Sequence, residues 1–170
     1  MNKLTKFFRN LLKNRQKLDL HYEARQSRKL PRDEAAVLVI RLDNIGDLVL
    51  WLDGARAIRA RYPRPRYRIT LAGSVEFREL AERTGLFDDF IAIDKVPYVW
   101  NNRYYKSILQ QVAAVRAAVA INPTYSRNRL SDALIYASGA TTCIGLEGEP
   151  GSEGERVGSA AAGDQDDVTG

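Results

Sequence analysis

One stretch in the first third of the chain constrains the fold more than any other. Residues 37–58, VLVIRLDNIGDLVLWLDGARAI, begin with an apolar run, pass through a short polar loop and end with apolar residues at helical spacing. An apolar run of this kind is typical of a strand that is covered on both faces of a parallel sheet. Ligands of such sheets collect at the loop after a strand's carboxyl end. The stretch therefore predicts an α/β fold, and Asp47 in the loop is the first candidate active residue.

The chain up to residue 148 continues this alternation. Runs rich in Val, Ile and Leu predict strands at 36–40, 67–72, 90–93, 118–121 and 141–146. Apolar residues at helical spacing predict helices at 45–61, 74–84, 104–117 and 131–137. Pro63 and Pro65 cannot continue the first helix, and Gly85 suits the end of the second. Right-handed crossovers would gather the strands into one mostly parallel, Rossmann-like sheet with helices on both faces.

The N-terminal arm, residues 1–33, has a character of its own. Its ten Lys and Arg against three Asp and Glu give the arm a charge of +7. Because the whole chain carries +5, the residues after the arm together carry 5 − 7 = −2. Apolar residues recur at helical spacing, with the basic residues largely on the other side: Leu4, Phe7, Phe8, Leu11 and Leu12. The pattern predicts a basic amphipathic helix. Such a helix can pack on the domain of its own chain or on another domain, or it can lie on an anionic membrane surface. Nucleic-acid binding is disfavoured, because the body has no recognisable nucleic-acid module.

Composition limits the site chemistry and the location. Cys143 and His21 are the only residues of their kinds, which excludes a disulfide framework and a zinc site with several Cys or His ligands. We expect no metal and no cofactor. The apolar part of the arm is far shorter than the ~20 residues of a spanning helix, and no signal-peptide core follows it. The expected location is cytoplasmic, with peripheral contact on the inner face of the cytoplasmic membrane.

The C-terminal residues differ from the rest. Residues 149–170 are mostly Gly, Ser, Ala and acidic residues with little to form a core, so we expect a disordered acidic tail behind a folded domain at 34–148. An α/β chain that passes from its fifth strand into such a tail looks interrupted. We therefore expect a truncated or frameshifted product, and the alternative is a natural solvated tail.

The polar loop after the first strand supplies the candidate site residues. Asp47 lies at the start of a helix, whose dipole favours a carboxylate that can accept a hydroxyl proton. Asp43 suits a hydrogen bond to a substrate hydroxyl or a helix cap, and Arg41 suits a carboxylate or phosphate. Gly46 would let the backbone turn and a substrate approach closely. The structural alternatives are a simple N-cap for Asp47 and a solvated or paired strand end for Arg41.

The stretch from Val37 to about Gly148 resembles a known family. The strand followed by Arg41-Leu-Asp43-Asn-Ile-Gly46-Asp47, and the later Ile144-Gly145-Leu146, are similar to the N-terminal, acceptor-side domain of glycosyltransferase family 9. The best-known members are the lipopolysaccharide heptosyltransferases. The resemblance implies one half of a GT-B architecture, whose other half holds the nucleotide-activated sugar. Trp51-Leu52-Asp53 departs from the Thr-x-Pro of many members.

The resemblance also implies a reaction and its partners. Asp47 would be the general base of an inverting transfer from a nucleotide-sugar donor to a lipid-linked saccharide acceptor. Besides Arg41, Asp43 and Gly46, the loop 122–127 after the fourth expected strand offers further acceptor contacts in Tyr125, Ser126 and Arg127, for which a plain turn is the alternative. Without its donor half, this chain is expected to be inactive alone.

Two other classes of function compete with this interpretation. A dinucleotide-binding redox domain would fit the alternating pattern, but the Gly-x-Gly-x-x-Gly phosphate loop is absent and a carboxylate stands in the first loop instead. A non-catalytic module that binds an acceptor or a membrane surface would fit the basic arm and the missing donor half. Binding without turnover would distinguish that module from an enzyme.

Overall fold

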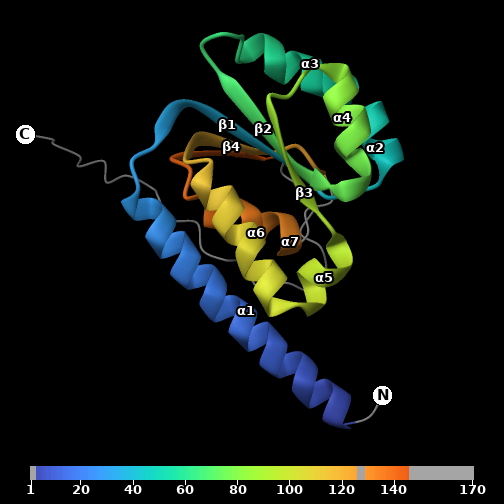
Figure 1. Ribbon diagram of the computed structural model, residues 1–170, viewed down its shortest axis with the longest axis vertical. Coiled ribbons are helices and arrows are strands. Elements are labelled where there is room, and N and C mark those ends of the chain that lie inside the picture. Colours follow the sequence, from blue (N-terminus) through green and yellow to red (C-terminus); the bar gives the residue numbers. More distant parts are fainter. Residues whose placement is uncertain (1–2, 126–128, 146–170) are drawn as a thin grey trace, which may run out of the picture.

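The computed structural model describes residues 3–125 and 129–145, with side chains from residue 10 onward. Five strands form one sheet in the order β3-β2-β1-β4-β5 (Figure 1). Their bounds are β1 Asp33–Arg41, β2 Arg68–Ser74, β3 Asp89–Ile93, β4 Ala117–Asn122 and β5 Thr142–Gly145. All neighbouring strands run parallel. This confirms the predicted α/β, Rossmann-like fold class.

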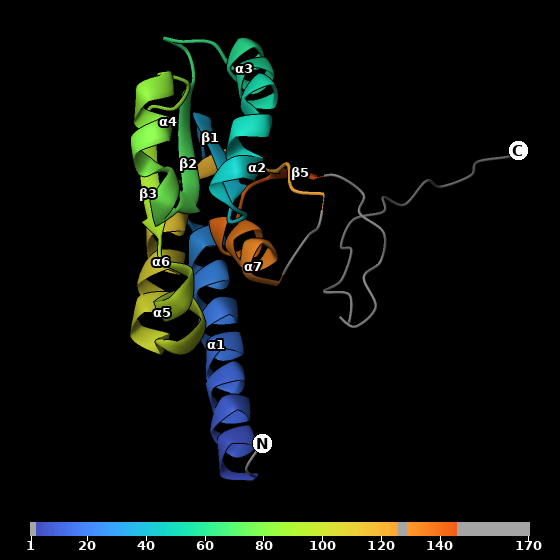
Figure 2. The ribbon, with the colours of Figure 1, turned by 90° about the vertical axis from the view of Figure 1, so that its right-hand side faces the viewer.

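Seven α-helices and one short 3₁₀-helix accompany the sheet in the described part of the chain. Their bounds are α1 Lys3–Lys29, α2 Ile45–Leu50, α3 Leu52–Arg61, η1 Val75–Phe77, α4 Arg78–Thr84, α5 Lys95–Trp100, α6 Asn102–Ala114 and α7 Arg129–Ser138. Figure 2 shows α3 and α4 beside the upper part of the sheet, with α5, α6 and α7 lower down near α1. The C-cap of α4 is Gly85, whose φ of 63° is left-handed as its predicted role requires.

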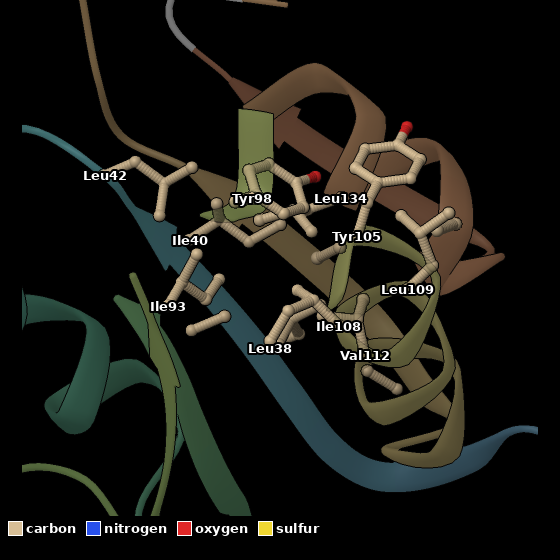
Figure 3. Close-up of a cluster of buried hydrophobic side chains, with 14 of the residues drawn as sticks. Leu38, Ile40, Leu42, Ile93, Tyr98, Tyr105, Ile108, Leu109, Val112 and Leu134 are labelled. Atoms are coloured by element: carbon tan, nitrogen blue, oxygen red, sulfur yellow. The ribbon is translucent and has the colours of Figure 1, made fainter. Parts of the chain in front are cut away.

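The strand β1 lies in the middle of the sheet and contributes to a core on each face. Leu38 and Ile40 belong to one cluster, into which α5, α6 and α7 send Tyr98, Leu109 and Leu134 (Figure 3). All five side chains are fully buried. Because side chains alternate along a strand, the neighbouring residues must point to the opposite face.

The second core covers that opposite face. Val37 and Val39 pack there with Ile69, with Ala81 of α4 and, at its margin, with Ile58 of α3. Burial on both faces explains the unbroken apolar sequence of the strand. It also fixes the carboxyl end of β1, so the polar loop that follows starts from a rigid position.

The helix predicted at 45–61 is divided in two. α2 ends at Leu50 and α3 begins at Leu52, and Trp51 between them has φ −90° and ψ 0°. The Trp51 N–H is shared between the carbonyls of Asp47 and Leu48, at 3.1 and 3.2 Å. The ring centre of the Trp51 indole lies 4.8 Å from the Arg41 guanidinium. A cation over an aromatic ring is stabilising, and this contact holds Trp51 against the end of β1.

The sequence did not predict α5. Its N-cap is Asp94, whose carboxylate accepts the Val96 N–H at 3.0 Å, and Pro97 occupies its third position. Proline is tolerated there because the first N–H groups of a helix have no intrahelical partner. The next helix also differs from the prediction. α6 ends at Ala114 rather than 117, and Arg116 then takes a φ of 52° before β4.

The arm forms a helix as predicted, and its C-terminal half packs on the domain against α6 and α7. Ala24 and Ser27 are buried, and the Ser27 hydroxyl donates to the Ser138 carbonyl at 2.8 Å. Nearer the N-terminus, the Gln16 amide donates to the Val99 carbonyl at 3.0 Å. Packing on its own domain is thus observed among the alternatives, while the N-terminal turns of α1 extend beyond the body (Figures 1 and 2). Across the described residues, no helix is both long and apolar enough to cross a bilayer.

Candidate functional site

The candidate site lies at the carboxyl edge of the sheet. There, β1 ends at Arg41 and its parallel neighbour β4 ends at Asn122. The 3₁₀-helix η1 follows β2 at the same edge and contacts α2. The helix α5 follows β3. The loop that leads into α2 is therefore surrounded by the segments that follow three other strands, which is where open parallel sheets bind ligands.

Asp47 is exposed, in the first turn of α2. Its carboxylate accepts the backbone N–H of Asn44 at 3.2 Å, and its own N–H donates to the Asn44 carbonyl at 3.0 Å. No other donor bonds to this carboxylate within residues 3–125 and 129–145. The capping contact uses one carboxylate oxygen, so the second remains open to solvent and to a substrate hydroxyl.

Arg41 is only 6% exposed and is already paired. It forms an ion pair with Asp43, whose Oδ1 accepts from the Arg41 Nε at 3.1 Å. Its Nη2 also reaches the Asp47 carbonyl at 3.4 Å, and its guanidinium lies on the Trp51 ring. These contacts match the alternative of a paired strand end. Arg41 holds the loop and the start of the helix together.

The geometry changes the interpretation of two other loop residues. Asp43 does not cap the helix, because Asn44 is the N-cap of α2 and the Asp43 carboxylate is paired with Arg41. Gly46 was expected to allow a turn, but its φ is not left-handed; among the described glycines, Gly85 and Gly139 have a positive φ. Apart from the two adjacent residues and the backbone of its own helix, no described atom lies within 4 Å of a Cβ built on Gly46. The expected room for close approach is therefore present beside Asp47, whereas the turn does not need glycine.

The loop after β4 faces the same edge. Tyr125 is 61% exposed, whereas Ser126 and Arg127 lie outside the described residues. Asn122 is buried, and its amide donates to the Ser131 hydroxyl at 3.2 Å while its oxygen accepts the Thr124 N–H at 3.3 Å. Tyr125 is the predicted contact in this loop that the structure describes. Its aromatic side chain is exposed, and the hydrogen bonds of Asn122 hold the start of its segment in place.

Lys95 is a site residue that sequence reasoning missed. Its ammonium donates to the backbone carbonyl of Asp43 at 3.3 Å, from the first position of α5. The available signal was its place, since it follows directly after the third strand and a capping Asp94. Lys95 adds a second cation to the loop beside Arg41, and it ties the β1 loop to the segment after β3.

Trp51 and Gly54 form a local pair. A Cβ on Gly54 would lie 2.5 Å from the Trp51 Nε1, which is well inside contact distance. The indole therefore occupies the space that any larger residue at position 54 would need. The contact of Trp51 with Arg41 makes this residue part of the loop's support.

Comparison with known proteins gives one informative result. The chain matches no protein-family model and no curated protein. Among solved structures, it is similar to "The crystal structure of the glycosyl transferase family 9 from Veillonella parvula DSM 2008", with a TM-score of 0.58 and 19% sequence identity. The match covers 69% of this chain and 33% of that one, so this chain spans about a third of the length of the protein it matches. At this identity the similarity shows a shared fold.

Proposed function

We propose that this chain is the acceptor-side half of a family 9-type glycosyltransferase, with Asp47 as the general base. The observation that carries the proposal is the exposed Asp47 carboxylate, which accepts one hydrogen bond among the described residues and stands beside the open space at Gly46. A carboxylate at the carboxyl edge of a parallel sheet is well placed to take a proton from a bound hydroxyl. The fold similarity to a glycosyl transferase family 9 protein supports the same class of reaction.

The proposed reaction is an inverting sugar transfer. The acceptor hydroxyl gives its proton to the Asp47 carboxylate as its oxygen bonds to the anomeric carbon of the donor sugar. The bond from that carbon to the nucleoside diphosphate breaks, and the diphosphate leaves with the electron pair. The acceptor would be lipopolysaccharide or a related lipid-linked saccharide of the cell surface. Its sugar rings would contact Tyr125 and the loop held by Arg41 and Asp43. Ser126 and Arg127, which lie outside the described residues, stay proposed contacts.

The donor half is a separate requirement. Departure of a diphosphate needs cations or amide groups positioned to stabilise its charge. A GT-B enzyme supplies most of these from its second domain, so we propose that acceptor binding is the part of the reaction that the described residues provide. A non-catalytic module that binds an acceptor or a membrane surface is the second candidate, and the exposed basic residues of α1 favour considering it.

The decisive experiment concerns Asp47. In a complete two-domain family protein with the same Asn-Ile-Gly-Asp loop, the counterpart of Asp47→Asn should abolish transfer to a lipopolysaccharide acceptor without loss of folding. Asp53→Asn is the matched control, because Asp53 is an exposed helix residue whose only ion pair is with Arg56 across the described residues. Near-normal turnover after the Asp47 change would remove it from catalysis. Acceptor binding by this chain, measured by calorimetry without donor, tests the binding-module alternative.

Membrane contact is a further part of the proposal, and its support is the outer face of α1. Leu11, Leu18 and Tyr22 are 56%, 72% and 56% exposed, and spacings of seven and four residues place them on one side of the helix. Exposed basic residues, Arg15 and Arg25, flank this stripe. We propose that it rests on the anionic inner face of the cytoplasmic membrane. Arg15→Glu/Arg25→Glu should lower sedimentation with vesicles that contain phosphatidylglycerol, and equal sedimentation with the parent would contradict the contact.

A further inference from the structure

A second concave site lies on the other side of the arm helix, away from its exposed stripe. α1 runs beside α6 and α7, and the end of α5 approaches it. Between them is a cavity of about 410 Å³. This volume falls within the range of about 300–1,000 Å³ that is usual for small-molecule sites. None of the residues from Arg41 to Asp47 lines it, so it is distinct from the Asp47 site.

The floor of this cavity is apolar. It includes Leu20 of α1, Val99 of α5, Tyr105 of α6 and Ala133 of α7, all buried or half-buried. Burial, helped by the nearby charge of Asp19, raises the pKa of Tyr105 to about 12, so this phenol is neutral at physiological pH. The floor thus presents hydrocarbon and aromatic surface, which favours an apolar ligand segment.

The rim of the cavity is charged and mainly basic. Lys13, Lys17 and Arg129 are exposed residues of the lining, against a single carboxylate from Asp132, so the rim carries 3 − 1 = +2 with His21 neutral. Lys13 and Lys17 are one helical turn apart and lie on the same side of α1. In the described part of the chain, neither lysine is paired with a carboxylate. Two adjacent ammonium groups above an apolar floor match a ligand with an anionic head and an apolar chain.

We propose that this cavity binds the hydrocarbon chain of a phosphate-bearing lipid, whose phosphate is held by Lys13 and Lys17. The chain would lie against Leu20, Val99 and Tyr105, and desolvation of this apolar surface would supply much of the affinity. The lysines add charge-assisted hydrogen bonds to the phosphate oxygens. The inference rests on the cavity and its charges, and it does not depend on transfer chemistry at Asp47.

The test uses the whole chain with dodecyl phosphate below its aggregation concentration, followed by titration calorimetry. Saturable binding at one molecule per chain is expected, and Lys13→Glu/Lys17→Glu should weaken it about tenfold or more, since each charged hydrogen bond contributes to affinity. The matched control is Arg61→Glu/Arg66→Glu, which makes the same change of charge at two exposed residues that do not line the cavity, and it should leave the affinity within about twofold. Thermal unfolding of each variant, compared with the parent, shows that the fold is intact.

Three further measurements distinguish a phosphate-bearing lipid from a neutral lipid, from inorganic phosphate and from a second copy of the chain. Dodecyl maltoside, with the same chain and a neutral head, should bind more weakly than dodecyl phosphate, and inorganic phosphate should not compete at equal concentration. Equal weakening by both double variants would overturn the proposal, because the lysines would then act only through net charge. Absence of saturable binding would also overturn it. So would a stable dimer that dodecyl phosphate does not dissociate, since a second copy would then fill the groove.

Discussion

Two carboxylates at opposite edges of the sheet, Asp88 and Asp47, differ in the hydrogen bonds that they accept. At the amino edge, Asp88 precedes β3 and accepts hydrogen bonds from Arg59 at 2.6 Å, Arg64 at 2.5 Å and the Ile69 N–H at 2.7 Å. At the carboxyl edge, Asp47 accepts a single hydrogen bond within the described part of the chain, from the Asn44 N–H. A carboxylate whose oxygens are all engaged stabilises structure, whereas one with an open oxygen can exchange a proton. The contrast separates structural from candidate catalytic acids in one molecule.

The largest expected effect is on turnover through Asp47. General base catalysis contributes about a hundredfold to ten-thousandfold, so the Asp47→Asn counterpart in a complete enzyme should lose activity on that scale. The free energy of unfolding of this chain should change by less than about 1 kcal/mol, because an Asn can still accept the Asn44 N–H. Urea denaturation of both proteins measures the second quantity. A large loss of stability would mean that Asp47, like Asp88, is mainly structural.

The next effect concerns Arg41. Arg41→Met should lower the free energy of unfolding by about 3 kcal/mol, because it leaves the poorly exposed Asp43 carboxylate without its partner. Arg56→Met is the control, since its ion pair with Asp53 is solvent-exposed, with side-chain exposures of 64% and 91%. That change should cost less than about 0.5 kcal/mol. Equal costs for the two variants would show that burial of the Arg41 pair has no energetic importance.

A smaller effect is expected at Gly54. Gly54→Ala should destabilise the fold by about 1–2 kcal/mol, because the new methyl group would meet the Trp51 indole. With Trp51→Leu already present, the same change should become stabilising by about 0.5–1 kcal/mol, since alanine favours a helix over glycine. Thermal unfolding of the parent, the two single variants and the double variant measures both changes in stability. If the sign does not reverse, Trp51 is not the reason that glycine occupies this position.

The smallest effect tests the amino edge through pH. Burial alone would raise the pKa of Asp88, but hydrogen bonds from Ile69 N–H, Arg59 and Arg64 together hold it below the usual value. A lowered pKa stabilises the fold above the unfolded value, near pH 4, and this stabilisation disappears as pH falls through the folded value. The urea midpoint should therefore fall more steeply between pH 6 and 3 in the parent than in Asp88→Asn. Parallel profiles would contradict the role given to these bonds.

Prediction from sequence succeeded where the pattern was local. All five strands were expected within three residues of their observed starts, because buried strands need continuous apolar runs. The short helix α5 was missed because its six residues, KVPYVW, include a proline and cannot show a helical period. The break at Trp51 was missed because the apolar residues before and after it keep one continuous helical spacing.

The sequence indicated residues that lie in the candidate site, but it did not indicate which of them pair with each other. Asp47 was singled out by its place between a strand and a helix; the structure places it exposed in the first turn of α2, and its catalytic role stays a prediction. Arg41 and Asp43 were predicted to contact a substrate, because the sequence does not show which charged side chains pair with each other. Lys95 stands 52 positions from Asp43, and only the fold brings its ammonium to that carbonyl. Long-range pairing of charges was the missing information.

The strand β5 offers a single position for a fluorescent label. Its four residues are all exposed, and one of them is Cys143, the chain's single cysteine. An edge strand offers unpaired backbone groups to any further strand or partner that settles there. A fluorophore attached to this thiol would therefore sense coverage of the open edge from one known position, without background from other cysteines. Its emission could then follow the binding of a partner at this edge without any catalytic assay.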